Sequence, residues 1–234
     1  MKNRNALSCW AFVFLMLTVG LAFFSWIASI YGWEPIQSLL SEEGVRWMLN
    51  HAVTDYAHHP VLGNTLVLLM GVGIGVHGGF YHALARSLHR KRQLSGRERR
   101  SLMLSMVVGT CYVGMVLCFL PFLKSVTGTF VHSPLYNGFF YLLSVGLGLM
   151  GSVYGFASNN YSHVSHVFNG MTHLIARYAG YWVTLFFIIL FFTAFGYTHM
   201  AEWLRIDGEW TDSVCLICCC LPFLHLLFYD SRRS

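Results

Sequence analysis

A single histidine, His77, lies in a strongly apolar stretch that runs from Thr65 to Phe80. An ionisable side chain within an apolar segment of membrane length is by default a hypothesis for a functional site. His77 therefore suggests a role in proton transfer or solute handling, and Asn64 offers a second polar group just before the stretch. The plainer alternative is a structural histidine near the membrane interface, which hydrogen-bonds a backbone carbonyl.

Glycines crowd the second half of the same stretch. In water each glycine destabilises a helix by about 1 kcal/mol relative to alanine. In a bilayer the helix backbone stays hydrogen-bonded. The glycines there let another helix or a ligand approach the backbone closely. We expect the helix Asn64–Gly79 to face a pathway, with the glycines of the fourth predicted span as the opposing wall: Gly146, Gly148, Gly151 and Gly155. The candidate pathway residues are Asn64, Gly71, Gly73, Gly75, His77, Gly78 and Gly79.

Three further residues have the spacing of weak metal ligands. His51, Asp55 and His58 recur at helical spacing, with His59 beside them, and histidine with carboxylate can hold zinc. The simpler interpretation is the polar face of an amphipathic helix in contact with water. We therefore predict no metal and no cofactor, and retain the three residues only as weak candidates.

The remaining reactive residues point away from catalysis. Cys215 and Cys218 have CxxC spacing, but they fall within an apolar segment, where cysteine behaves as a small apolar residue. The sequence has no phosphate loop, nucleophile elbow or HExxH zinc helix. The segments expected to span a membrane contain almost no acids. We predict that the protein is not an enzyme.

Composition places these residues in a membrane protein. Of the 234 residues, 56% are hydrophobic and only 11% are charged, compared with about 25% charged in average soluble domains. Several apolar runs exceed the ~18 residues that indicate a membrane span. The predicted fold is all-α and polytopic. The net charge of +5 is no nucleic-acid signal, because topology accounts for it.

The chain reads as a single membrane domain over 1–234, with about six spans and one interfacial amphipathic helix over 41–57. That helix should begin at Ser41, whose side chain can cap it, followed by Glu42 and Glu43. The spans are expected at about 7–31, 61–85, 102–123, 138–157, 179–198 and 213–229.

Charge sets the expected orientation. With both termini cytoplasmic, the inner segments hold 12 of the 15 Lys and Arg residues and the outer segments hold 8 of the 10 acids. This follows the positive-inside rule, so we predict an integral inner-membrane protein with cytoplasmic termini. The basic segment from Arg86 to Arg100 is then a cytoplasmic loop, and a site for anionic lipid is its alternative interpretation.

The stretch from Gly44 to Phe80 contains Pro60-Val61-Leu62-Gly63 and then Leu69-Met70-Gly71-Val72-Gly73. It resembles an early segment of the AbgT family, the p-aminobenzoyl-glutamate transporters. Ser133-Pro134-Leu135 followed by Tyr154-Gly155 is similar to a later span. Asn169-Gly170-Met171 and the aromatic pattern from Tyr181 to Phe187 resemble the helix after it.

The resemblance implies a secondary transporter of p-aminobenzoyl-glutamate or a similar small anionic aromatic solute, with proton or sodium coupling. The chain departs from the family where an acid usually precedes Ser-Gly, because it has Val76 and then His77-Gly78-Gly79. We expect a shortened member that lacks the family's substrate-site region and associates into a homo-oligomer in the lipid bilayer. The alternative is a non-transporting membrane scaffold or pore-like effector on a truncated transporter fold.

Overall fold

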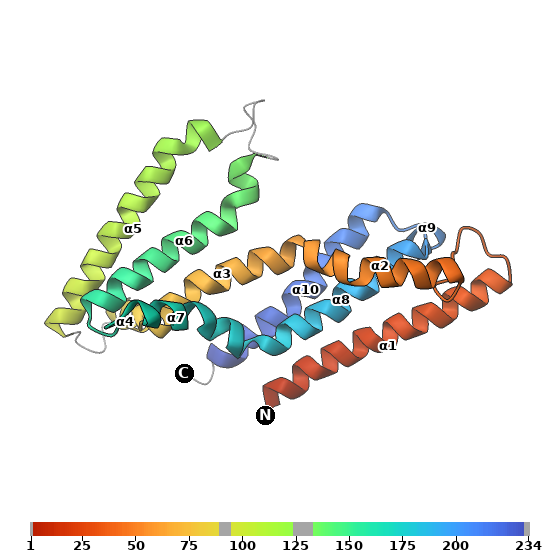
Figure 1. The fold of residues 1–234 in the computed structure, drawn as a ribbon, viewed down its shortest axis with the longest axis horizontal. Coiled ribbons are helices and arrows are strands. Elements are labelled where there is room, and N and C mark those ends of the chain that lie inside the picture. The colour runs from red at the N-terminus through yellow and green to blue at the C-terminus, as the bar shows by residue number, and fades with distance from the viewer. Residues whose placement is uncertain (1, 89–94, 124–132, 232–234) are drawn as a thin grey trace. The chain divides into compact units, whose positions relative to one another are not determined.

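A computed structural model describes residues 2–88, 95–123 and 133–231 (Figure 1). Every regular element in these ranges is a helix, which confirms the all-α prediction. The chain divides into two compact units. Unit 1 comprises 1–63 and 178–234, and unit 2 comprises 64–177.

Unit 1 contains α1 (Lys2–Ile30), α2 (Glu42–His58), α8 (Ala179–Tyr197), α9 (Met200–Trp203) and α10 (Gly208–Ser231). Along α1 the buried apolar residues recur every seven positions, at Leu7, Phe14, Leu21 and Ala28. A seven-residue repeat keeps one stripe of a helix against its neighbour, and α1 packs along α8 (Figure 1). This stripe therefore holds the first helix of unit 1 in place.

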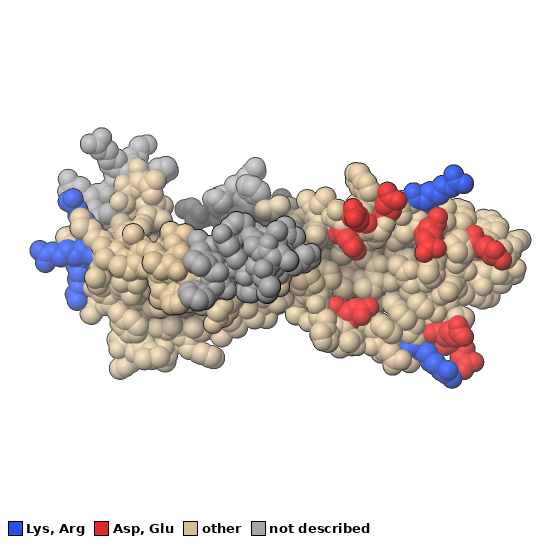
Figure 2. Space-filling model, turned by 90° about the horizontal axis from the view of Figure 1, so that it is seen from above, with Lys and Arg blue, Asp and Glu red and all other residues tan. Residues whose placement is uncertain are grey.

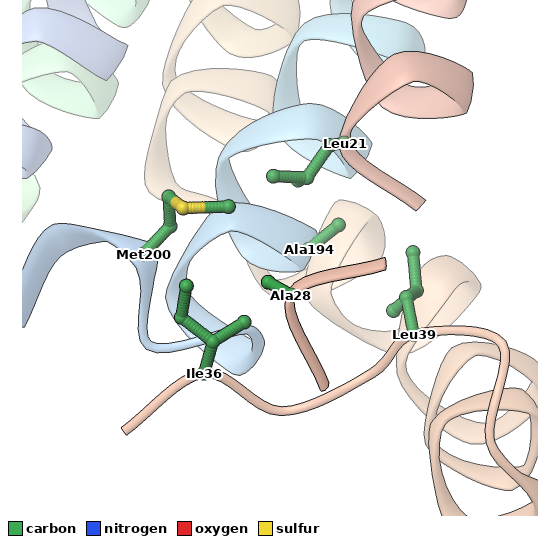
Figure 3. Packing of buried hydrophobic residues seen from close by; sticks show 6 residues of the cluster. All are labelled: Leu21, Ala28, Ile36, Leu39, Ala194 and Met200. Atoms are coloured by element: carbon green, nitrogen blue, oxygen red, sulfur yellow. The ribbon is translucent and has the colours of Figure 1, made fainter. Parts of the chain in front are cut away.

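The far end of α1 is closed by a small apolar core (Figure 3). Leu21 and Ala28 contribute from α1, and Ala194 contributes from α8. Ile36 and Leu39 reach the same cluster from the segment that leads to α2, and Met200 reaches it from α9. This core fixes the start of α2, which begins as predicted because the Ser41 side chain accepts a hydrogen bond of 3.0 Å from the Gly44 amide.

Unit 2 contains most of α3 (Pro60–His77), with α4 (Phe80–Leu88), α5 (Gly96–Leu123), α6 (Pro134–Ala157) and α7 (Val164–Arg177). Within this unit α5 packs along α6. There the Tyr112 hydroxyl donates to the Leu142 carbonyl oxygen over 2.8 Å. Phe80, Ala83, Leu102 and Tyr154 form a buried cluster that joins α4 to this pair.

Five stretches of the described chain are long and apolar enough to cross a membrane: Leu7–Ile30, Glu42–His77, Gly96–Phe119, Leu135–Ala157 and Ala179–Tyr197. Within an apolar segment of 18 residues in each stretch, between 17% and 33% of the residues are buried inside the protein. Most of the apolar side chains therefore face outward, as is expected of helices surrounded by lipid. The fold is that of a polytopic membrane protein. The sixth predicted span, 213–229, is helical within α10 but is not among the five, and it stays a prediction.

Two boundaries differ from the sequence-based expectation. The predicted span 61–85 is divided, because α3 ends at His77 and α4 begins at Phe80. The basic segment predicted as a loop becomes helical at Gly96, so Arg97, Arg99 and Arg100 lie in the first turns of α5. Residues 89–94 of that segment lie outside the described residues.

Candidate functional site

The break between α3 and α4 is built on two glycines. Gly79 has φ +78°, a left-handed backbone that glycine adopts without the steric cost of a Cβ. Gly78 is buried, and a Cβ there would lie 3.1 Å from the Tyr161 hydroxyl oxygen. The two residues predicted as pathway glycines therefore form the turn that ends α3.

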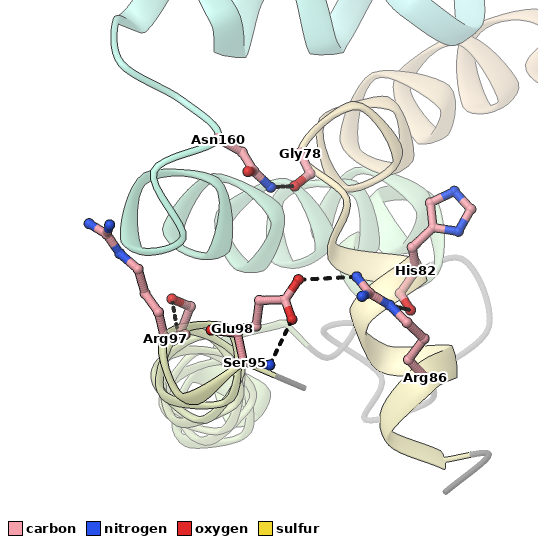
Figure 4. Close-up of polar contacts among 8 residues, drawn as sticks. Gly78, His82, Arg86, Ser95, Arg97, Glu98 and Asn160 are labelled. Atoms are coloured by element: carbon pink, nitrogen blue, oxygen red, sulfur yellow. Dashed lines mark hydrogen bonds and ion pairs between the residues drawn. The ribbon is translucent and has the colours of Figure 1, made fainter. Parts of the chain in front are cut away.

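Two consecutive side chains after α6 bind the end of α3. Asn160 Nδ2 donates to the Gly78 carbonyl oxygen over 2.8 Å (Figure 4). The Tyr161 hydroxyl donates to the Ile74 carbonyl oxygen over 2.7 Å, and the phenol is buried. Burial raises the pKa of Tyr161 to about 12, so the phenol keeps its proton at neutral pH. The Asn160 bond satisfies a carbonyl group of the kind that a helix end leaves unpaired, and the Tyr161 bond adds a second donor to a carbonyl that also accepts the Gly78 amide.

Gly71, Gly73 and Gly75 of α3 contact neighbouring helices. A Cβ at Gly73 would lie 2.5 Å from the Gly170 carbonyl oxygen of α7, and one at Gly71 would overlap the Ser144 backbone of α6. From the opposite side, a Cβ at Gly151 would lie 2.7 Å from the Gly75 amide nitrogen. The glycines of 138–157 were predicted to lie opposite α3, and here Gly151 meets it directly. We call this glycine-lined contact of α3 with α6 and α7 the seam.

A serine completes the seam. The Ser144 hydroxyl on α6 donates to the Val67 carbonyl oxygen on α3, and Ser144 is buried. Serine hydroxyls that hydrogen-bond across helices help membrane helices to associate where water is absent. The seam therefore combines close backbone approach with a hydrogen bond between the two helices.

His77 is the last residue of α3 and its side chain is exposed beside the break. Its ring centroid lies 6.0 Å from that of Tyr161 and 5.4 Å from that of His173 on α7. Burial lowers the pKa of His173 from its ordinary value, and the nearby His77 and Arg177 lower it further. The break thus gathers two titratable imidazoles from different helices.

Asn64 does not join this group. It lies thirteen residues before His77 on the same helix, which corresponds to roughly 20 Å at 1.5 Å per residue. The structure therefore brings His77, Gly78 and Gly79 together with Asn160, Tyr161 and His173, and leaves Asn64 half-buried at the other end of α3. Neither Asn160 nor Tyr161 was predicted from the sequence as a site residue.

The weak metal candidates on α2 gain no support. His51 Nδ1 lies 3.1 Å from the Trp47 carbonyl oxygen, and His58 Nδ1 lies 2.8 Å from the Thr54 carbonyl oxygen. Asp55 is half-buried on the same helix. Within the part of the chain that the structure describes, no three histidine, cysteine or acidic side chains gather closely enough to hold a metal ion.

The basic segment is tied to the break through α4. Arg86 pairs with Glu98 of α5 at 3.2 Å, and Glu98 also accepts a hydrogen bond of 3.0 Å from the Ser95 amide (Figure 4). One arginine is thus neutralised within the protein. Arg97, Arg99 and Arg100 are exposed, so the cytoplasmic-loop and anionic-lipid interpretations of this segment both stay predictions.

These features define a class of protein. It is a polytopic helical membrane protein whose glycine-rich helix α3 ends at a turn held by polar side chains. Residues 2–111 match the AbgT putative transporter family, which confirms the resemblance indicated by the motifs.

A solved structure has the same fold. The crystal structure of the Alcanivorax borkumensis YdaH transporter superposes with a TM-score of 0.75 at 15% sequence identity, covering 88% of this chain and 74% of that chain. No curated protein matches. Family and fold support a membrane transporter and favour it over an enzyme.

Proposed function

We propose that this chain is an AbgT-like secondary transporter of a small anionic aromatic solute, with p-aminobenzoyl-glutamate as the first candidate. The observation that carries the proposal is the break in α3 at Gly78–Gly79, held by Asn160 and Tyr161. Interrupted membrane helices form the solute and ion sites of many secondary transporters because their ends leave backbone groups free to bind ligands.

The seam supplies a second part of the proposal. Because α3 touches α6 and α7 through glycines, its backbone approaches theirs closely, and Ser144 is the side chain that bridges α6 and α3 there. Such a contact can separate and close again with little repacking of side chains. We assign the seam as the barrier of the pathway in its closed state, with the Gly78–Gly79 turn as the hinge.

His77 supplies the coupling group in this scheme. It stands at the carboxyl end of α3, where the helix dipole favours positive charge. It also faces His173 across the break. A proton taken up by this pair would add positive charge beside the hinge, which gives an anionic solute a partner there. We therefore propose proton coupling through His77, with sodium coupling as the alternative to be tested.

The test is flux of radiolabelled p-aminobenzoyl-glutamate in proteoliposomes, with and without a proton gradient and with and without a sodium gradient. Wild-type flux should exceed that of empty vesicles and should follow the proton gradient. His77→Ala should abolish the gradient dependence. His82→Ala is the matched control, because His82 is also exposed and lies just beyond the break on α4.

Two other outcomes would reject parts of the proposal. Equal flux in wild type and His77→Ala would remove His77 from the mechanism. No flux above empty vesicles, with folded protein present in the membrane, would exclude transport of this solute, and dye leakage from the same vesicles would then favour the pore-like effector. The topology with cytoplasmic termini is checked by protease protection of an epitope tag fused to either terminus.

A further inference from the structure

Unit 1 contains a groove that the proposed pathway does not use. Its volume is about 630 Å³, within the range of pockets that bind small molecules. Phe191, Phe192 and Phe195 of α8 form one wall, and Trp210 of α10 forms part of the other. The walls are therefore almost entirely aromatic and apolar.

The groove crosses the expected boundary of the membrane. Its phenylalanines belong to the last two turns of α8, a helix long and apolar enough to span a bilayer. Trp210 is 67% exposed and lies beyond the end of that helix, and tryptophan is enriched at the level of lipid headgroups. One part of the groove thus lies at acyl-chain depth and the other part at headgroup depth.

Two opposite charges stand at the headgroup end. Arg205 and Asp207 both line the groove from the segment between α9 and α10. In the described parts of the chain, no acidic side chain lies within ion-pair distance of Arg205, and Asp207 has no basic partner. Each charge is therefore available to a ligand.

The surroundings of the groove are acidic. Glu202, Glu209 and Asp212 are all exposed close to it in the chain, and red acidic groups gather on the surface of unit 1 (Figure 2). This negative field disfavours a headgroup with net negative charge. It accepts a headgroup whose phosphate is accompanied by an ammonium group.

We propose that this groove binds one phospholipid with an ethanolamine headgroup. An acyl chain lies against Phe191, Phe192 and Phe195, the phosphate pairs with Arg205, and the ammonium group pairs with Asp207. The site is independent of the transported solute, because no group at the α3 break contributes to it.

The experiment is native mass spectrometry of the full chain, released from micelles that contain equal amounts of phosphatidylethanolamine and phosphatidylglycerol. Wild type should retain one phosphatidylethanolamine at least about threefold more often than phosphatidylglycerol. Arg205→Gln and Asp207→Asn should each lower its retention about threefold, the magnitude of one partly exposed ion pair. Val214→Trp, which fills the groove from α10, should remove it.

Matched controls lie in the same unit. Arg46→Gln changes an exposed arginine on α2, and Glu43→Gln changes an exposed acid on the same helix that does not line the groove. Neither should alter retention. The proposal is overturned if phosphatidylglycerol is retained equally well, if the groove variants retain as much phosphatidylethanolamine as the controls, or if p-aminobenzoate displaces the lipid. All these measurements are independent of transport activity.

Discussion

The Tyr161 hydroxyl donates a hydrogen bond of 2.7 Å to the Ile74 carbonyl oxygen, and this bond joins the segment after α6 to the last turn of α3. The same carbonyl accepts the Gly78 amide at 2.9 Å. One oxygen is thus shared by the turn that ends α3 and by a side chain from 87 residues further along the chain. The shape of the break therefore depends on tertiary structure as well as on its glycines.

Replacing Tyr161 by phenylalanine should lower the free energy of unfolding by about 1 kcal/mol, the net contribution of one hydrogen bond. The carbonyl keeps its Gly78 partner, so the penalty should not reach that of an unpaired buried group. Thermal unfolding in detergent micelles measures the effect. Tyr141→Phe on α6 is the control, because Tyr141 is 63% exposed. Equal melting of the two variants would show that the bond contributes nothing.

The seam predicts a contrast between two glycines of α6. In Gly151→Ala the new methyl group meets backbone atoms of Gly75 and Ile74, so the helices must move apart, at a cost of about 1–3 kcal/mol. In Gly138→Ala nothing lies within 4 Å of the new group. We expect a lower melting temperature only for Gly151→Ala. If Gly138→Ala is equally destabilised, close helix contact is not the reason for the glycines.

Much of this arrangement follows from local sequence pattern. Hydropathy predicts the long helices, and Ser41 predicts the start of α2 because a cap acts on an amide three residues away. The glycines of α3 and of the fourth predicted span predicted that two helices approach each other closely, and Gly75 and Gly151 are in contact. Each of these signals is contained in one short segment.

The partners of the break could not be predicted in the same way. Asn160 and Tyr161 act on carbonyls more than 80 residues away, and Ser144 acts on one 77 residues away. Any polar side chain of suitable length can bind a carbonyl, so residue type alone does not reveal the contact. The closeness of His173 to His77, with ring centroids 5.4 Å apart, likewise depends on how α7 packs.

The pair of His77 and His173 gives a prediction for pH. Burial and the neighbouring His77 and Arg177 lower the pKa of His173, so the folded state holds this proton less tightly than the unfolded chain. Stability contributed by neutral His173 is present above about pH 6.5 and falls as the pH drops below that value. NMR titration of the imidazole should give a midpoint below 6.5, and His77→Gln should raise it. An unchanged midpoint would contradict the proposed contact.

The pairing of Arg86 with Glu98 predicts a difference between two substitutions. Glu98→Gln has a single acceptor oxygen and can keep a hydrogen bond from only one of the two donors, Arg86 or the Ser95 amide, whereas Glu98→Ala loses both contacts. Because both side chains are partly exposed, the ion pair itself should contribute about 1 kcal/mol or less. Thermal unfolding should therefore give the highest melting temperature for wild type, a lower one for Glu98→Gln and the lowest for Glu98→Ala.

High salt should reduce the difference in melting temperature between wild type and Glu98→Gln, because salt screens the charges of the ion pair. High salt should not change the difference in melting temperature between Glu98→Gln and Glu98→Ala, because a hydrogen bond accepted by the neutral glutamine depends little on salt. A difference in melting temperature between wild type and Glu98→Gln that persists in high salt would mean that hydrogen bonding, not charge, joins α4 to α5.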